Sequence, residues 1–211
     1  EKYAHDVYVR NNLMVTSEIY KGEFAIIDVS DRTNPVALAT QNTPSNFTHN
    51  TWLSDDGNTL FTTDERANAS VSAYDISDFS DIEFLDSFRA EQETGLIPHN
   101  VHVKDNFLVV SHYTAGVLVL DATETDALTL VEYYDTSFES GGGFKGCWGA
   151  YPFLPSGNIL ASDRQNGLII VKPNYERAAY IEGNVMNSET DEYMSNVNIY
   201  LSEVNSSETS D

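Results

Sequence analysis

The chain has 211 residues, of which 41% are hydrophobic, 11% aromatic and 21% charged, a composition typical of one globular domain with or without a small appendage. Its formal net charge of −22 excludes nucleic acid as a partner and disfavours anionic membrane surfaces, because both would repel it. No apolar run approaches the roughly 18 residues that a membrane-spanning helix requires. The single cysteine, Cys147, cannot form an intrachain disulfide, and its small and aromatic neighbours indicate a buried structural thiol.

A short motif repeats along the chain at an interval typical of β-propeller blades. The motif opens with His5-Asp6, His49-Asn50, His99-Asn100 and, in a fourth copy, Trp148-Gly149. The openers lie 44, 50 and 49 residues apart, close to the roughly 40–50 residues of a four-stranded blade. We therefore predict an all-β chain that forms about four blades, the C-terminal part of a larger propeller. The predicted blades cover residues 4–40, 48–88, 98–134 and 147–174.

Each copy has the pattern of three strands joined by two tight turns. The first turns are rich in Asn, Asp and Gly, the residues that adopt positive φ at least cost. Third strands such as VLVLD are nearly continuous in aliphatic residues, which indicates burial on both faces. An outer fourth strand is predicted at 36–40, 82–88 and 128–134, but the fourth copy lacks one. Residues 1–3 cannot complete that blade, so we expect a donor strand and earlier blades upstream of Glu1.

Residues 177–211 differ from the repeats, and we predict that they begin a second β domain. The sequence reads strand, polar turn and strand, without a His-Asn opener. Between Glu182 and Asp211 there are seven acidic residues and no Lys or Arg. The final segment, NSSETSD, is expected to be disordered because it has no apolar residue to bury.

The start of each first strand and the end of each second strand should share one rim, because the two strands run antiparallel. The second strands end in Ser17-Glu18, Asp64-Glu65, Ser111-His112 and Asp163-Arg164. The second residue of each pair lies 13, 16, 13 and 16 residues after its opener. We attribute the three extra residues to the longer turns of copies two and four. The rim is therefore expected to be rich in His, Asp and Glu.

Two interpretations of this rim remain open. In the first, the recurring residues serve blade geometry and the rim face binds a ligand, with candidates His5, His49, His99, His112, Tyr113, Asp163 and Arg164. In the second, imidazoles and carboxylates converge on a divalent metal, with candidate ligands His5, His49, His99, Glu18 and Glu65. His102 is set apart because its equivalents are Tyr8, Trp52 and Tyr151, which indicates a packing position between blades.

The ordered motifs of residues 1–174 resemble the LVIVD-repeat propellers, known as choice-of-anchor B proteins. The matching segments are FAIIDVSD (24–31), HNTWLSDDGNTLFTTDE (49–65), PHNVHV (98–103), VLVLDATE (117–124) and GCWGAYPFLPSGNILASD (146–163). The segment IEGNV at 181–185 is similar to the opening of a carboxypeptidase-regulatory-like β-sandwich. The resemblance implies export and attachment at a bacterial cell surface, and it brings no settled enzymatic activity.

We therefore predict a secreted or surface-displayed propeller that acts as a binding or scaffold module, is not an enzyme and requires no cofactor. Its ligand could be a protein, a small molecule or a glycan, and the sequence does not distinguish among them. The alternative hypothesis is a metal-dependent hydrolase or oxidoreductase whose His and carboxylate ligands lie at the mouth of the propeller channel.

Overall fold

A computed structural model describes residues 3–90, 94–201 and 206–209 and divides the chain into two units, Glu1–Ala178 and Ala179–Asp211. Every regular element in the described residues is a β-strand, which confirms the all-β prediction. None of the described segments forms a helix of the length and hydrophobicity needed to cross a membrane.

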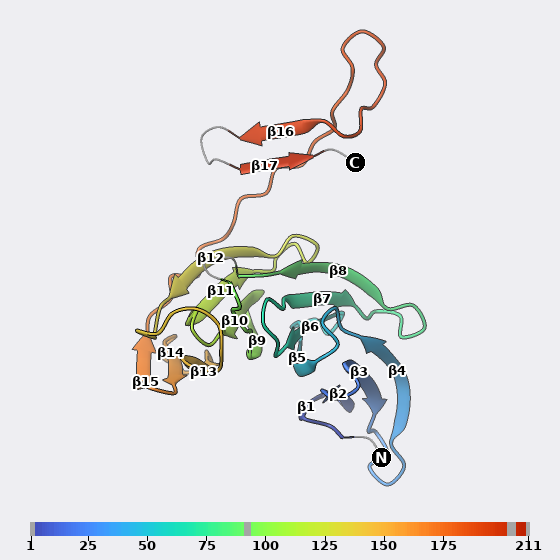
Figure 1. The fold of residues 1–211 in the computed structure, drawn as a ribbon. Coiled ribbons are helices and arrows are strands. Elements are labelled where there is room, and N and C mark those ends of the chain that lie inside the picture. The colour runs from blue at the N-terminus through green and yellow to red at the C-terminus, as the bar shows by residue number, and fades with distance from the viewer. Residues whose placement is uncertain (1–2, 91–93, 202–205, 210–211) are drawn as a thin grey trace. The chain divides into compact units, whose positions relative to one another are not determined.

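The first unit contains four antiparallel sheets, and in each sheet the strands follow one another in chain order (Figure 1). The first sheet consists of β1 (Asp6–Arg10), β2 (Leu13–Glu18), β3 (Glu23–Asp28) and β4 (Val36–Asn42). The second consists of β5 (Thr48–Leu53), β6 (Thr59–Asp64), β7 (Val71–Asp75) and β8 (Glu83–Phe88). The third consists of β9 (Asn100–Lys104), β10 (Phe107–Ser111), β11 (Val117–Asp121) and β12 (Thr129–Tyr134). The fourth has only β13 (Cys147–Tyr151), β14 (Ile159–Asp163) and β15 (Gly167–Val171), as the sequence predicted.

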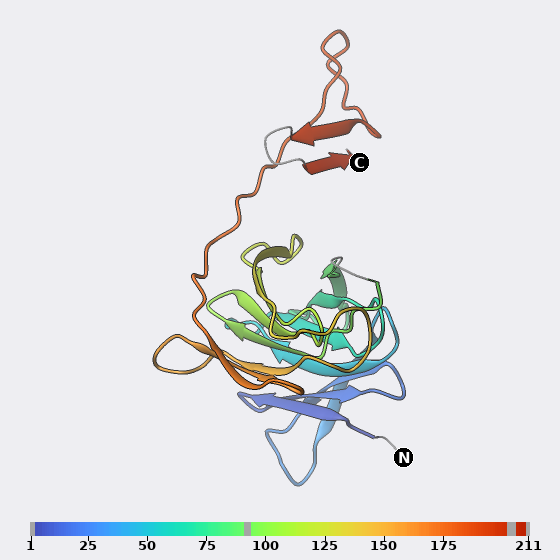
Figure 2. The ribbon, with the colours of Figure 1, turned by 60° about the vertical axis from the view of Figure 1, so that its left-hand side comes forward.

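The four sheets are arranged as propeller blades in an arc. Figure 1 shows the first strands β1, β5, β9 and β13 on the inner side of the arc and the fourth strands β4, β8 and β12 on the outer side. Figure 2 shows the same sheets from a second direction, and buried side chains of successive sheets pack against one another. The inner ends of the first strands therefore come close together although they are far apart in the sequence.

Three hydrophobic clusters hold successive sheets together. Alternation along β6 sends Leu60 toward the first sheet and Phe61 toward the third, so both faces of the strand are buried. In the same way β10 places Leu108 against the second sheet and Val109 against the fourth. Each such side chain stabilises the fold by roughly 1.5–3 kcal/mol relative to leaving it exposed. Burial on both faces was predicted for the third strands; it is found in β7 and β11, whereas β15 of the fourth blade is largely exposed.

The Asp that ends each third strand of the first three blades caps the turn that follows. A side-chain oxygen of Asp28, Asp75 and Asp121 accepts the N–H of the residue two positions later at 2.8, 2.8 and 2.9 Å. The third of these carboxylates also binds the end of the first unit, because it pairs with Arg177 at 2.9 Å and accepts the N–H of Ala178 at 2.8 Å. The first unit consequently extends slightly beyond the predicted boundary at residue 176.

The second unit contains one hairpin, β16 (Asn198–Leu201) paired with β17 (Ser206–Thr209), and an isolated bridge between Met186 and Tyr193. The expectation of a disordered final segment is wrong for Ser206–Thr209, because these residues form backbone pairs with β16. The rest of that segment, residues 205, 210 and 211, lies outside the described residues. Residues 181–185 form no strand, and a β-sandwich is not shown by this hairpin.

Candidate functional site

The strand register corrects the predicted alignment of the rim. Asp6, Asn50, Asn100 and Gly149 pair with Ser17, Thr63, Ser111 and Ser162. The longer turns of blades two and four thus add two residues, not three. Glu65 and Arg164 therefore correspond to Tyr113 of blade three, whereas Glu18 and His112 correspond to Asp64 and Asp163. This one-residue shift decides which carboxylate reaches the inner end of the rim.

Three predicted residues come together there, and we call them the His–Glu cluster: His49, Glu65 and His99. One ligand atom from each lies within 4.8 Å of the other two. The Nε2 atoms of His49 and His99 lie 3.7 Å from Oε2 and Oε1 of Glu65, respectively. Both histidines are buried, and the Glu65 side chain is only 15% exposed. The second blade supplies two members of the cluster and the third blade supplies one.

Both imidazoles are held in the neutral form that can bind a metal. Burial lowers the pKa of His49, although the nearby Glu65 carboxylate partly opposes this. Burial, helped by the proximity of His49, lowers the pKa of His99 to about 3. Nδ1 of His49 lies 2.9 Å from the His99 carbonyl oxygen. Because a carbonyl only accepts, Nδ1 carries the proton and the lone pair is on Nε2, facing Glu65.

The donor atoms have a spacing that fits one divalent ion. Metal–ligand bonds of roughly 2.0–2.1 Å place adjacent donors of a tetrahedral site about 3.4 Å apart. The two observed N–O separations of 3.7 Å are close to this value and are too long for direct hydrogen bonds. Two neutral imidazoles and one carboxylate form a donor set known from catalytic zinc sites, which keep a fourth position for water or substrate.

Tyr113 orients the carboxylate of this cluster. Its hydroxyl donates to Oε1 of Glu65 at 2.5 Å, and its ring meets that of His99 edge to face at a centroid distance of 5.2 Å. The backbone φ of Tyr113 is +33°, a conformation that a bulky residue rarely adopts and that is often retained at functional positions. The sequence placed Tyr113 on the rim but gave no indication of its contact with Glu65.

The remaining predicted residues do not join the cluster. His5 is exposed and packs its ring on that of His49 at a centroid distance of 4.4 Å. Glu18 is buried and pairs with Lys21 at 3.2 Å. His112 is fully buried, and burial lowers its pKa to about 4. The Asp163 carboxylate accepts hydrogen bonds from the backbone N–H groups of Gln165 and Asn166 and from the hydroxyl of Thr136. The last of these bonds holds the loop after the third blade. The structure therefore does not bring Glu18 into the group of converging donor atoms.

His102 is a packing residue, as predicted. Its ring lies 4.7 Å from that of Trp52 and 5.8 Å from that of Phe153, so it contacts residues of both adjacent blades. Burial lowers its pKa to about 4. Cys147 is also buried as expected, and burial raises the pKa of its thiol to about 12, which makes it unreactive at neutral pH.

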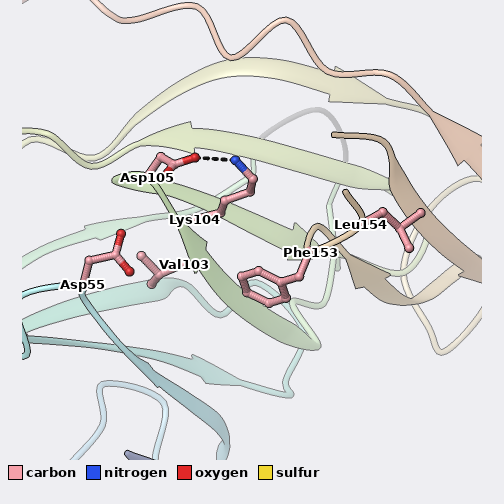
Figure 3. A pocket seen from close by; sticks show the side chains of 6 residues that line it. All are labelled: Asp55, Val103, Lys104, Asp105, Phe153 and Leu154. Atoms are coloured by element: carbon pink, nitrogen blue, oxygen red, sulfur yellow. Dashed lines mark hydrogen bonds and ion pairs between the residues drawn. The ribbon is translucent and has the colours of Figure 1, made fainter. Parts of the chain in front are cut away.

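A hollow of about 360 Å³ lies at the opposite ends of the first strands (Figure 3). It is lined by Asp55, Val103, Lys104, Asp105, Phe153 and Leu154. Lys104 is paired with Asp105, and Figure 3 shows no set of side chains that converges on one point. The His–Glu cluster is the stronger candidate site.

Comparisons with solved structures identify the fold. The chain superposes on the periplasmic gluconolactonase PpgL of Pseudomonas aeruginosa with a TM-score of 0.65 and 11% identity, covering 91% of this chain and 52% of that one. It matches a putative 6-phosphogluconolactonase from Bacteroides uniformis with a TM-score of 0.63 and 14% identity, covering 96% and 68%. A third match is the β-propeller domain of Cps50 (Swd1) from Myceliophteria thermophila, with a TM-score of 0.58, 12% identity and coverage of 80% and 50%. The chain thus has a β-propeller fold and spans about half the length of PpgL.

No family model matches the chain, and no curated protein matches it either. The interpretation as a non-enzymatic binding or scaffold module is contradicted, because structures in this comparison include a gluconolactonase and putative 6-phosphogluconolactonases. At 11–15% identity the likeness itself establishes only the fold. The alternative hypothesis, a hydrolase with His and carboxylate groups at the channel mouth, agrees better with these neighbours.

Proposed function

We propose that this chain is part of a β-propeller hydrolase that opens lactones or related cyclic esters at the inner rim. The observation that carries the proposal is the convergence of His49, Glu65 and His99, whose ligand atoms lie within 4.8 Å of one another. The names of the similar structures, a gluconolactonase and a putative 6-phosphogluconolactonase, support a lactone as the substrate. These names favour a hydrolase over the oxidoreductase that the sequence also left open.

The residues of the site would bind a divalent ion and keep it available to substrate. His49 and His99 would each bind through a neutral Nε2, and Glu65 would contribute one carboxylate oxygen. A bound ion of this kind polarises a carbonyl group and lowers the pKa of a bound water molecule toward neutrality. The His99 carbonyl fixes the His49 tautomer, while the Tyr113 hydroxyl fixes the Glu65 carboxylate, so the donors are oriented before the ion arrives.

The test combines metal content with lactone hydrolysis by the full chain. We expect one divalent ion per chain and hydrolysis of glucono-1,5-lactone that a chelator abolishes. We expect Glu65→Gln to reduce hydrolysis by about 100-fold or more, because the loss of an anionic ligand weakens binding of the ion on which the proposed chemistry depends. The matched control is Glu124→Gln, which makes the same change in an exposed turn. Hydrolysis that is unaffected by both the chelator and Glu65→Gln would contradict the proposal.

We also retain two proposals that rest on sequence motifs. The first is membership of the LVIVD-repeat propellers with secretion or display on a bacterial cell surface. The second is that residues 177–211 begin a carboxypeptidase-regulatory-like domain. Fractionation of producing cells, with the protein followed by antibody, tests the first; a cytoplasmic location would contradict it. A solved structure of residues 177–211 tests the second; a hairpin that packs in no β-sandwich would contradict it.

A further inference from the structure

We propose that Arg164 and Trp148 form an oxyanion-binding subsite beside the His–Glu cluster, so that preferred substrates carry a phosphate or carboxylate group. This inference rests on the proposed function, because it names the substrate class of the same site. It adds what the cluster alone does not supply, a means of holding the part of the substrate that does not react.

The subsite is a hollow on the rim of the fourth blade. It has a volume of about 250 Å³ and is lined by Trp148, Ser162, Asp163 and Arg164. The indole ring of Trp148 is 53% exposed and lies 5.0 Å, centroid to centroid, from the ring of His99. The hollow is therefore next to a member of the cluster, within the span of a substituted sugar lactone.

Within the described residues, no carboxylate forms an ion pair with Arg164. Its guanidinium donates to the carbonyl oxygen of Phe144, and among the described residues it forms no ion pair. Lys21 and Lys145, two other basic residues near this rim, are each paired with glutamates. Arg164 is the basic residue that lines this hollow, and its side chain is exposed to solvent.

The acidic residue in the hollow, Asp163, has hydrogen-bond partners of its own and forms no ion pair with Arg164 in the described part of the chain. The Asp163 carboxylate is 95% buried as a residue and is already bonded by the N–H groups of Gln165 and Asn166 at 2.9 and 2.8 Å, and by the Thr136 hydroxyl at 3.0 Å. Arg164 borders the same hollow as Trp148, whose ring lies 5.0 Å from that of His99, so the guanidinium is on the side of the cluster that this hollow adjoins.

Guanidinium and indole together recognise an anionic ring compound. The planar fork of an arginine donates two parallel hydrogen bonds to a phosphate or carboxylate, which a lysine cannot match. The exposed indole face offers an apolar surface against which the C–H face of a sugar ring can pack. A lactone held by both would have its anionic group on the fourth blade and its ester toward the cluster on the second and third blades.

The test uses the full chain with two lactones that differ only in a phosphate group, glucono-1,5-lactone and its 6-phosphate. We expect kcat/KM to be higher for the phosphorylated lactone, and we expect Arg164→Gln to reduce the ratio of the two values by about 10- to 100-fold, the usual effect of losing a charge-assisted hydrogen bond. Arg164→Lys should give an intermediate loss. Arg32→Gln, which removes the same charge from an exposed turn of the first blade, should leave the ratio within twofold. Equal ratios in wild type and Arg164→Gln would overturn the proposal.

A binding measurement separates this proposal from the proposed hydrolysis. Titration of the wild-type chain with inorganic phosphate and with acetate should show binding of at least one anion, weakened by Arg164→Gln but not by Arg32→Gln. Binding of phosphate alone assigns a phosphate group to the substrate, and binding of acetate alone assigns a carboxylate. If the chain hydrolyses no lactone but still binds an anion through Arg164, the subsite stands and the lactonase proposal fails. If neither anion binds, the subsite is refuted whatever the hydrolytic activity.

Discussion

Replacing Tyr113 by phenylalanine removes one hydroxyl from the site and leaves the ring in place. That hydroxyl donates to Oε1 of Glu65 at 2.5 Å, a short bond to an ionised acceptor. Hydrogen bonds to charged groups contribute roughly 1.5–3 kcal/mol. If the whole of this energy orients the carboxylate for metal binding, the dissociation constant should rise by about 10- to 100-fold, the range known for residues that support metal ligands.

The assay is calorimetric titration of the metal-free chain with Zn²⁺ or Co²⁺ at about pH 7. Tyr134→Phe is the matched control, because the Tyr134 hydroxyl also donates to a glutamate, Glu132, but on the third blade's outer strand. The control should leave metal affinity unchanged. With Co²⁺, the visible absorption of the Tyr113→Phe complex should also change, since the carboxylate is free to bind differently. An affinity that equals that of the control would refute the orienting role of Tyr113.

Three other predictions concern stability. Gly116→Ala should lower the free energy of unfolding by roughly 1–3 kcal/mol more than Gly157→Ala. Both glycines have positive φ, but only at Gly116 would a Cβ meet a backbone oxygen, at 2.1 Å; urea unfolding measures the difference. Asp64→Ala should cost about 3 kcal/mol in the same assay, since three hydrogen bonds of 2.6–2.9 Å to the loop between the first two blades are lost. The pKa of His99 is about 3 in the folded chain and about 6.5 in the unfolded chain, so between these pH values the unfolded chain binds more protons. The free energy of unfolding should therefore fall by about 2 kcal/mol from pH 6.5 to pH 5. The fall should be smaller in His99→Gln.

The blade pattern could be predicted from the sequence because it depends on local chemistry. Turns such as Asn11-Asn12 and Asp105-Asn106 have the positive φ angles that their composition indicates. The outer strands were also found, but the bulge between the third and fourth strands of each four-stranded blade was not. A bulge inserts one residue into one strand, and the outer strands β4, β8 and β12 are too exposed for their hydrophobic pattern to reveal the insertion.

The site was predicted only in part, because the ends of the second strands were aligned one residue out of register between blades. His49 and His99 were correctly placed together, since the repeat aligns their strands. Glu18 was included and Tyr113 was not linked to Glu65, because their relative positions depend on turn lengths that differ by two residues between blades. Aligning the copies through the residues that close each turn, such as Ser54 and Thr59, would have placed Glu65 beside Tyr113. No local sequence motif distinguished an enzyme from a binding module, because His49 and His99 lie 50 residues apart in the chain.

The origin of the His–Glu cluster in two different blades has a consequence for assembly. An ion bound by His49 and Glu65 on one side and His99 on the other would act as a staple across the boundary between the second and third blades. Its binding free energy would then appear as resistance of that boundary to opening, about 2.7 kcal/mol when the free ion is present at 100 times its dissociation constant. Hydrogen exchange in β6 and β9 should slow on metal addition while exchange in β3 is unchanged. Affinity for the ion would then depend on whether the second and third blades are packed together.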